Sequence, residues 1–327
     1  MRAVSLFSGG LDSQLAVCLI KDQGIDVVAV NFVSPFFGAD PRFRQAASQL
    51  KAEYHEIGVG NEYMEMLKNP VYGYGKNFNP CIDCHAFMIK RAGVFMREIG
   101  ASFLFTGEVL GERPMSQNKN ALYQVEKLSG CQGLILRPLS AKLLPPTIPE
   151  IEGWVDRDLL LDLSGRGRTR QMELAEHYGL KDYPTPAGGC LLTQEAFTRR
   201  LRLLLSRQPE SGLEAMEILK LGRHFLIAEN VLLVVGRNHS ENERLSRLAA
   251  PKDYLLKVTN RPGPTGLVKS LGSEQQLDLT RAAAIVARYS DARDLPLVSV
   301  SITSPNDDAA EIMSVVPVPA GDVPPSV

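Results

Sequence analysis

The sequence lacks the long apolar segments that mark membrane proteins and secreted precursors. No apolar run approaches the ~20 residues needed to cross a bilayer. Arg2 is followed by a short mixed segment, whereas a signal peptide would continue into a long apolar region. We therefore expect a protein without membrane contact and with a cytoplasmic location.

Neither sign of charge is in excess, and cysteine is scarce. The 36 Lys and Arg residues balance 37 Asp and Glu residues to a formal net charge of −1. A nonspecific nucleic-acid binder is usually strongly basic, so contact with RNA must depend on a local patch. Only five cysteines occur in 327 residues. In a cytosolic chain of this length, grouped cysteines indicate a metal site or catalysis more often than disulfides.

In the first half of the chain, short apolar segments alternate with helical patterns. Strands are expected at 3–7, 26–33 and 102–106, and helices at 12–23, 40–53, 86–99 and 169–179. This alternation is typical of βαβ units and a parallel sheet. The expected fold class is α/β, with a Rossmann-like parallel sheet followed by a smaller α+β domain. Such sheets bind ligands at the carboxyl ends of their strands.

From residue 194 the pattern changes. The expected elements are an amphipathic helix from 194, two strands within 223–237, a helix at 239–249, a strand at 253–259, a turn at 261–266, a helix at 276–289 and a strand at 296–303. We therefore divide the chain into a domain at 1–187, a second domain at 188–303 and a Pro-rich tail at 304–327.

The segment SGGLDS, residues 8–13, follows the first expected strand and precedes the first expected helix. Gly9 and Gly10 let the backbone bend tightly and expose successive N–H groups. Ser8 and Ser13 add hydroxyl donors, and the helix directs its positive end to the same place. These features favour a polyphosphate ligand.

The loop has no lysine, which separates it from the G-x-x-x-x-G-K-[ST] phosphate loop. Asp12 occupies the turn instead, and a carboxylate beside phosphates needs an intervening cation, so we expect Mg²⁺ at Asp12. The alternative is a glycine turn with an Asp or Ser helix cap.

The order strand–SGGLDS–helix resembles the signature of the PP-loop ATP pyrophosphatases. These enzymes cleave ATP between the α and β phosphates and adenylate a carbonyl oxygen of a substrate. The resemblance implies that Asn31 and Phe32 lie near the adenine. It also implies that pyrophosphate and Mg²⁺ are bound by Ser8, Gly9, Gly10, Asp12 and Ser13.

Three further segments resemble the tRNA-thiolation branch of that family. NPCIDCHAFMIKRA (79–92) is similar to the NP-x-x-x-C-N segment of tRNA 2-thiouridylases, with Cys84 in the place of the sulfur-handling cysteine. Cys81 stands where those enzymes carry an Asp, and the resulting C-x-x-C pair, just before the expected helix at 86–99, resembles iron–sulfur-dependent tRNA thiolases. TGEVLGERPMSQ (106–117) is similar to a segment of tRNA 4-thiouridine synthases. The resemblance implies that Thr106, Gly107 and Glu108 face the nucleotide and the target base.

The segment YPTPAGGCLLT (183–193) is similar in its place in the chain to the segment of the thiouridine synthases that carries their second sulfur-handling cysteine. In this sequence the corresponding cysteine is Cys190. Replacing a base carbonyl oxygen by sulfur needs a leaving group, which ATP supplies, and a sulfur nucleophile. The resemblance implies a [4Fe–4S] cluster on Cys81, Cys84 and Cys190, since thiolates are the usual ligands. The alternatives are a persulfide on Cys84 and Cys190, a redox dithiol and half of a zinc site with His85 nearby.

Residues 222–260 resemble the RNA-binding module of NFACT proteins. Between 196 and 250 the chain carries nine Arg and Lys residues and six Glu residues, and RGRTR at 166–170 adds three arginines. Phosphate contacts from such cations determine affinity and register but not sequence choice. The alternative is that these arginines are solvated side chains on a helix face.

The sequence as a whole predicts an ATP-dependent tRNA sulfurtransferase with Asp12, Cys81, Cys84 and Cys190 as catalytic residues. The expected partners are tRNA and a sulfur donor, either sulfide or a carrier protein, and the resemblance implies a homodimer. One alternative is a PP-loop ligase or amidotransferase that acts on a small molecule. Another is an RNA-binding or quality-control protein whose nucleotide site only senses ATP.

Overall fold

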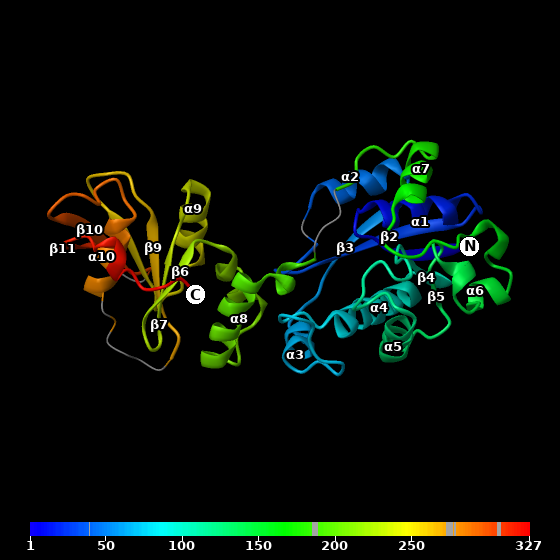
Figure 1. The fold of residues 1–327 in the computed structure, drawn as a ribbon, viewed down its shortest axis with the longest axis horizontal. Helices are drawn as coiled ribbons and strands as arrows, with labels where there is room; N and C mark the ends of the chain where they lie inside the picture. Colours follow the sequence, from blue (N-terminus) through cyan, green and yellow to red (C-terminus); the bar gives the residue numbers. More distant parts are fainter. Residues whose placement is uncertain (39, 185–188, 273–276, 278, 306–308) are drawn as a thin grey trace. The chain divides into compact units, whose positions relative to one another are not determined.

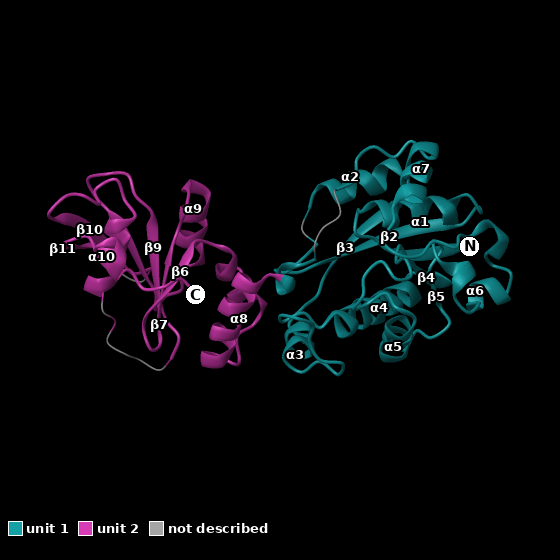
Figure 2. Cartoon of the chain, viewed as in Figure 1, with its two compact units in different colours: residues 1–193 teal, residues 194–327 magenta. Residues whose placement is uncertain are grey.

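Two sheets of different kinds organise the chain in this computed structural model (Figure 1). The structure describes residues 1–38, 40–184, 189–272, 277, 279–305 and 309–327. Met1–Thr193 and Gln194–Val327 form separate compact units, coloured teal and magenta in Figure 2. The expected boundary between residues 187 and 188 falls outside the described residues. We call the two parts unit 1 and unit 2.

Unit 1 contains a sheet of five parallel strands in the order β3-β2-β1-β4-β5. The strands are β1 (Arg2–Leu6), β2 (Asp26–Val33), β3 (Glu53–Gly58), β4 (Phe103–Thr106) and β5 (Ile135–Leu136). The central strands are apolar and buried, as expected for a parallel sheet covered on both faces. The chain order reverses between β1 and β4, so the carboxyl ends of these two strands form the switch point where such sheets bind ligands.

Helices cover both faces of this sheet. They are α1 (Leu11–Lys21), α2 (Arg42–Gln49), α3 (Glu62–Lys68), α4 (Cys81–Glu98), α5 (Lys119–Ser129), α6 (Ile148–Ile151) and α7 (Thr169–His177). In Figure 1, α1, α2 and α7 lie on one side of the sheet, and α4 and α5 lie on the other. Alanine and branched side chains of α1 and alanines of α2 belong to one buried apolar cluster that also contains Phe103 and Phe105, which accounts for the apolar periodicity of these helices.

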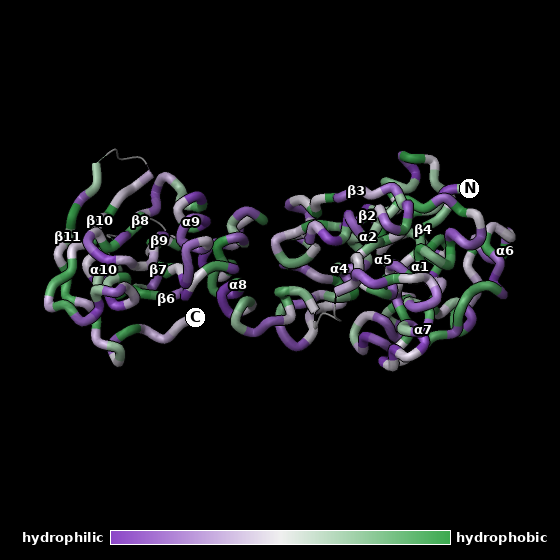
Figure 3. Tube along the Cα trace, turned by 90° about the horizontal axis from the view of Figure 1, so that it is seen from above, coloured by the Kyte–Doolittle hydropathy of each residue, from purple (hydrophilic) through white to green (hydrophobic). Residues whose placement is uncertain are grey.

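Unit 2 is built on an antiparallel sheet in the order β11-β10-β8-β9-β7-β6. Its elements are α8 (Glu195–Arg207), β6 (Arg223–Ala228), β7 (Val231–Val235), α9 (His239–Leu248), β8 (Tyr254–Val258), β9 (Thr265–Ser270), α10 (Leu279–Arg288), β10 (Val298–Thr303) and β11 (Glu311–Val315). The buried run Ala282–Ala287 of α10 packs on the strands. Figure 3 shows the contrast between the apolar strand β7 and the largely hydrophilic helix α9.

The expected fold class, a Rossmann-like parallel sheet followed by a smaller α+β domain, is confirmed. Several local predictions differ from the structure. Helix α4 begins at Cys81, so the cysteine pair lies in its first turn and not before it. The segment separated as a Pro-rich tail contributes β11, which pairs with β10. Strands β3 and β9 were not expected: no residue of β3 is fully buried, and β9 begins at Thr265, within the turn expected at 261–266.

No helix in the described part of the chain combines the length and apolarity that a membrane crossing requires.

Candidate functional site

The first turn after β1 has the shape of an anion-binding loop. Phe7 extends the sheet by donating its N–H to the Val30 carbonyl oxygen at 2.8 Å. Gly9 then takes a φ of +68°, a conformation that other residues rarely adopt. Helix α1 begins at Leu11 with Gly10 as its N-cap and has no side-chain cap. Its first N–H groups are therefore available to an anion.

Side chains of α1 bind the carbonyl groups of the loop. The Ser13 hydroxyl donates to the Gly10 carbonyl oxygen at 2.8 Å, and the Gln14 amide donates to the Gly9 carbonyl oxygen at 2.9 Å. The Ser8 and Ser13 hydroxyl oxygens lie 3.4 Å apart. With the carbonyls bound, the backbone N–H groups at the start of α1 remain available for phosphate oxygens.

Asp12 lies in the first turn of α1 beside two arginines. Burial raises the pKa of its carboxyl, while the charge of Arg168, a hydrogen bond from Gln171 and the charge of Arg113 lower it in part. The Oδ1 atom of Asp12 is buried, and no described residue forms a hydrogen bond with it. Arg168 precedes α7 and was grouped with the RNA-binding cations, so its place beside Asp12 was missed in the sequence.

Glu112 lies in the segment 106–117, four residues after Glu108. Burial raises the pKa of its carboxyl, and the negative charge of Asp12 raises it further. The two carboxyl groups therefore lie close enough to repel each other when both are ionised.

Asn31 and Phe32 lie near the carboxyl end of β2, and both are buried. The Asn31 side-chain amide donates to the Gly38 carbonyl oxygen at 2.7 Å and so holds the segment that follows β2. Contact between these residues and adenine remains a prediction.

The segment 106–108, which follows β4, packs directly on the first turn of α1. A Cβ atom on Gly107 would lie 2.5 Å from the Ser13 amide nitrogen and 2.6 Å from the Asp12 carbonyl carbon. Only glycine allows this close approach. The residue after it, Glu108, is buried and is hydrogen-bonded on both carboxylate oxygens.

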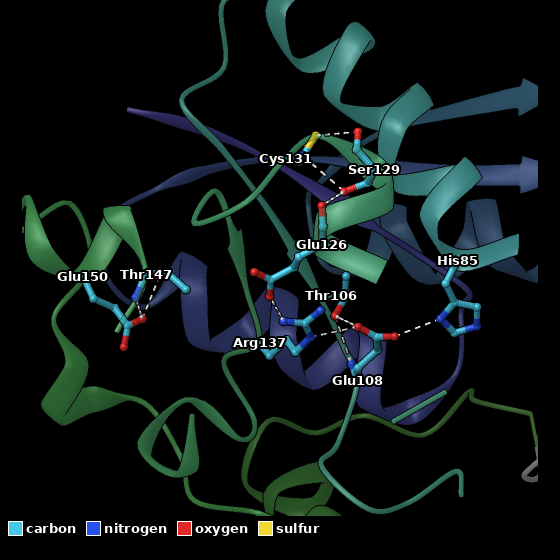
Figure 4. A network of polar contacts seen from close by, with 9 residues as sticks. All are labelled: His85, Thr106, Glu108, Glu126, Ser129, Cys131, Arg137, Thr147 and Glu150. Atoms are coloured by element: carbon cyan, nitrogen blue, oxygen red, sulfur yellow. Dashed lines mark hydrogen bonds and ion pairs between the residues drawn. The ribbon is translucent and has the colours of Figure 1, made fainter. Parts of the chain in front are cut away.

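The Glu108 carboxylate joins four segments of unit 1 (Figure 4). Arg137, after β5, donates to it at 3.0 Å, and His85 on α4 contacts it through Nδ1 at 2.9 Å. Arg137 also donates to Glu126 on α5 at 2.5 Å. Burial would raise the pKa of Glu108, but the charge of Arg137 and the hydrogen bonds from His85 and Arg137 outweigh it and lower the pKa to about 2. Glu108 is therefore a carboxylate.

The cysteine pair is held by polar neighbours in the first turn of α4. The Asn79 amide donates to Cys81 Sγ at 3.2 Å, and the Tyr63 hydroxyl lies 3.2 Å from Cys84 Sγ. Asp83, between the cysteines, accepts N–H groups from Val71 at 2.6 Å and from Tyr72 at 3.1 Å. Tyr63 was not predicted as a site residue, because no local pattern distinguishes it. Asn79 is the first residue of the NPCIDCH motif, but it was not assigned a role.

Cys190 lies close to the pair although more than 100 positions separate them in the sequence. The Phe78 N–H donates to the Leu192 carbonyl oxygen at 3.3 Å, and the Asn77 amide donates to Thr193 at 2.6 Å. Burial raises the pKa of the Cys84 thiol to about 12, with further contributions from the neighbouring Cys190 and Cys81 sulfurs. The three thiols are therefore within electrostatic reach of one another. No group of three metal-ligating side chains is preformed among the described residues.

The predicted basic patch of unit 2 is largely neutralised by neighbouring groups. Ion pairs join Arg207 to Glu229, Lys220 and Arg244 to Glu217, Arg237 to Glu241 and Arg247 to Glu243. Arg200 donates to the carbonyl oxygens of Leu219 and Val327. Arg199 and Arg202 lie exposed, three residues apart, on α8.

An open hollow of about 640 Å³ lies at the opposite, amino edge of the unit 1 sheet, lined by residues such as Arg2, Lys21 and Ser102. It contains none of the predicted site residues.

Comparison with known proteins gives separate matches for the two units. Residues 1–142 match the family "Thiamine biosynthesis protein (ThiI)", and residues 222–325 match the "NFACT protein RNA binding domain". The resemblance to the PP-loop thiolation enzymes and to the NFACT module is thereby confirmed.

Three relatives illustrate the similarity. A probable tRNA sulfurtransferase of Thermococcus kodakarensis is 31% identical over 147 residues, which are 42% of this chain and 36% of that protein. The tRNA-specific 2-thiouridylase MnmA of Pelobacter propionicus is 25% identical over 178 residues, 51% of this chain and 50% of that protein. A crystal structure of a 4-thiouridine synthetase–RNA complex with bound ATP shares 21% identity at a TM-score of 0.38, covering 66% of this chain and 52% of that one. The chain thus spans about a third to a half of the length of these two curated relatives.

Proposed function

We propose an ATP-dependent tRNA sulfurtransferase activity for this chain. The chain joins a PP-loop domain of the ThiI type to an RNA-binding domain of the NFACT type. One observation carries the proposal. The segment that follows β4 touches the phosphate loop at Gly107 and touches the cysteine helix at Glu108. Groups suited to binding ATP and groups suited to handling sulfur therefore share one edge of the sheet.

The phosphate loop fits the pyrophosphate part of ATP. We assign pyrophosphate to the N–H and hydroxyl groups of residues 8–13, because α1 lacks a side-chain cap. The buried, unpartnered Oδ1 of Asp12 fits a Mg²⁺ ion, which would also relieve its repulsion from phosphate. Arg168, beside Asp12, supplies positive charge for the phosphate oxygens.

The reaction requires two displacements. In the first, the uridine carbonyl oxygen attacks the α-phosphorus of ATP, and pyrophosphate leaves with the bonding electrons. In the second, sulfide adds to the activated ring carbon and AMP leaves with the original oxygen. N–H groups at the helix terminus and the guanidinium of Arg168 would stabilise the charge that develops on the departing phosphates.

Cys81, Cys84 and Cys190 form a donor set suited to an iron–sulfur cluster. Burial raises the pKa of the metal-free Cys84 thiol, and binding to a metal would displace its proton. A persulfide mechanism needs only two of the three cysteines, so the proximity of all three thiols supports the cluster. When bound, a [4Fe–4S] cluster on three thiolates would supply an open iron site for sulfide.

Unit 2 is the proposed tRNA-docking part, and its match to the NFACT RNA-binding domain supports this. Arg199 and Arg202 are the side chains best placed for phosphate contacts, because both are exposed on one helix. The proposal retains the cytoplasmic location, where thiols stay reduced. The sulfur donor, sulfide or a carrier protein, and the homodimer remain predictions.

The test uses protein purified without oxygen and incubated with ATP, Mg²⁺, tRNA and sulfide. We expect release of pyrophosphate and AMP with incorporation of sulfur into tRNA, and about four irons per chain. Cys190→Ala and Cys81→Ala should lose iron and sulfur transfer, while Cys131→Ala, a buried cysteine outside the trio, should retain both. Absence of AMP release by the wild type would refute the proposed activity. Activity in an iron-free protein would refute the cluster alone.

A further inference from the structure

The segment 106–108 is a physical link between two parts of the proposed site. Its middle residue, Gly107, lies against the backbone of Asp12 and Ser13 in the first turn of α1. Its last residue, Glu108, lies against His85 in the first turn of α4. Any change in the first turn of α1 must therefore be accommodated by a segment that also holds the start of α4.

The position of Glu108 is determined by hydrogen bonds from several directions. Thr106 Oγ1 donates to Oε2 at 3.0 Å, and Arg137 Nε donates to the same oxygen at 3.0 Å. Oε1 is directed to His85, as Figure 4 shows. Arg137 is itself buried and is held from the other side by Glu126. The carboxylate has little freedom to move independently of the segment that carries it.

The contact with His85 defines the state of the imidazole. Because Glu108 is a carboxylate, it accepts a hydrogen bond, so His85 Nδ1 carries the proton. His85 directly follows Cys84, in a helical turn that begins at Pro80 without a side-chain cap. The orientation of this turn depends on the hydrogen bonds made by its side chains. One of them, the hydrogen bond from His85 to Glu108, connects the turn to the segment that packs on the phosphate loop.

We propose that Glu108 and His85 are positioning residues that couple the cysteine pair to the occupancy of the nucleotide site. The inference rests on the proposed function, because it takes ATP as the ligand of the phosphate loop. Binding at that loop would shift the first turn of α1 and with it the segment 106–108, and the Glu108–His85 hydrogen bond would transmit this shift to the turn that carries Cys81 and Cys84. A carboxylate that only stabilises the fold would not make thiol reactivity depend on nucleotide.

The experiment measures alkylation of Cys81 and Cys84 by N-ethylmaleimide with peptide mass spectrometry, in the metal-free full chain. Rates are compared with and without α,β-methylene-ATP and Mg²⁺, an analogue that resists cleavage between the α and β phosphates. In the wild type we expect the analogue to slow alkylation about fivefold or more, the usual scale of coupling between sites.

Four variants separate coupling from simple shielding and from structure. His85→Ala should bind the analogue, as measured by calorimetry, and should lose most of the protection. Glu108→Gln should lose most of the protection at analogue concentrations that saturate that variant. His85→Asn should retain it, because its amide can donate to Glu108 from nearly the place of Nδ1–H. Glu62→Gln is the matched control. Glu62, on α3, pairs with Arg91 on α4, the helix that also carries His85. It should respond like the wild type.

Each failure has a separate meaning. If the wild type does not bind the analogue, the proposed function falls and the inference falls with it. If the wild type binds it without protection, or if protection persists in both Glu108→Gln and His85→Ala, only the inference is refuted. Equal loss in His85→Asn and His85→Ala also refutes it. Should Glu108→Gln not fold, the two His85 variants decide, because His85 is partly exposed.

Discussion

Each unit contains a Glu–Arg pair, and the two pairs differ in their surroundings. In unit 1, Glu108 and Arg137 have side-chain exposures of 9% and 3%. Glu108 also contacts His85, and Arg137 also pairs with Glu126. In unit 2, Glu241 is 11% exposed but Arg237 is 48% exposed. Glu241 also accepts N–H groups from Arg237 and Gly222. The same two residue types thus form an internal network in one unit and a helix-terminus contact in the other.

The two units differ in where their charged side chains lie: unit 1 buries both members of its Glu–Arg pair, whereas unit 2 leaves the arginine exposed to solvent. Burial of several charges is costly unless every partner is in place, so a network such as that of Glu108 constrains its surroundings closely. The exposed arginines of unit 2 can be exchanged or screened at small cost. A preorganised reaction site suits the first arrangement, and a surface for RNA phosphates suits the second.

The largest predicted effect is the loss of the cation in the unit 1 network. Arg137→Met leaves Glu108 and Glu126 without their shared partner and should lower the free energy of unfolding of unit 1 by about 3–5 kcal/mol. Arg237→Met should cost unit 2 at most about 1 kcal/mol. Hydrogen exchange followed by mass spectrometry reports each unit separately. Equal losses in the two variants would contradict the contrast.

Acid should destabilise unit 2 before it acts on the unit 1 network. Burial lowers the pKa of His224 to about 3, so the unfolded chain binds its proton first. The contribution of neutral His224 to the free energy of unfolding is fully present above pH 6.5, and it is lost as the pH falls toward 3. Glu108 has a lowered pKa of about 2, so its contribution is lost only between pH 4.5 and 2.

Between pH 7 and pH 5, His224 alone should therefore lower the stability of unit 2 by about 2 kcal/mol. In His224→Gln this part of the pH dependence should disappear, which hydrogen exchange of β6 and β7 peptides at the two pH values can measure. An unchanged slope in that variant would show that His224 is not responsible.

The smallest predicted effect concerns the exposed arginines of α8. Arg199→Gln with Arg202→Gln should weaken tRNA binding about tenfold and reduce the slope of log affinity against log salt by about two, one for each lost phosphate contact. Filter binding at several salt concentrations gives both quantities. Arg247→Gln serves as the comparison, since Arg247 lies on α9 and not on α8, and it should change the slope less.

Local patterns were sufficient for most elements of the fold. The strand–SGGLDS–helix order predicted β1, the loop and α1, because a short apolar strand, two glycines and a helical period are adjacent in the chain. The start of α4 was misplaced, because Cys81 and Cys84 were interpreted as a loop motif although they occupy the first helical turn. Strand β11 was missed because its sequence lies among prolines and small residues, and its pairing partner β10 supplies the missing stabilisation.

The sequence by itself determined the phosphate loop and the cysteine pair, since each depends on residues within one short segment and on backbone preferences that act locally. The resemblance had already implied that Cys190 lies near Cys84, and the structure places these thiols close together. Only the tertiary structure decided that Arg168 lies beside Asp12 and that Glu108 joins His85 to Arg137. These contacts join segments that are far apart in the chain. They form only when packing of the sheet and its helices offsets the entropy of closing long loops, which no local pattern records.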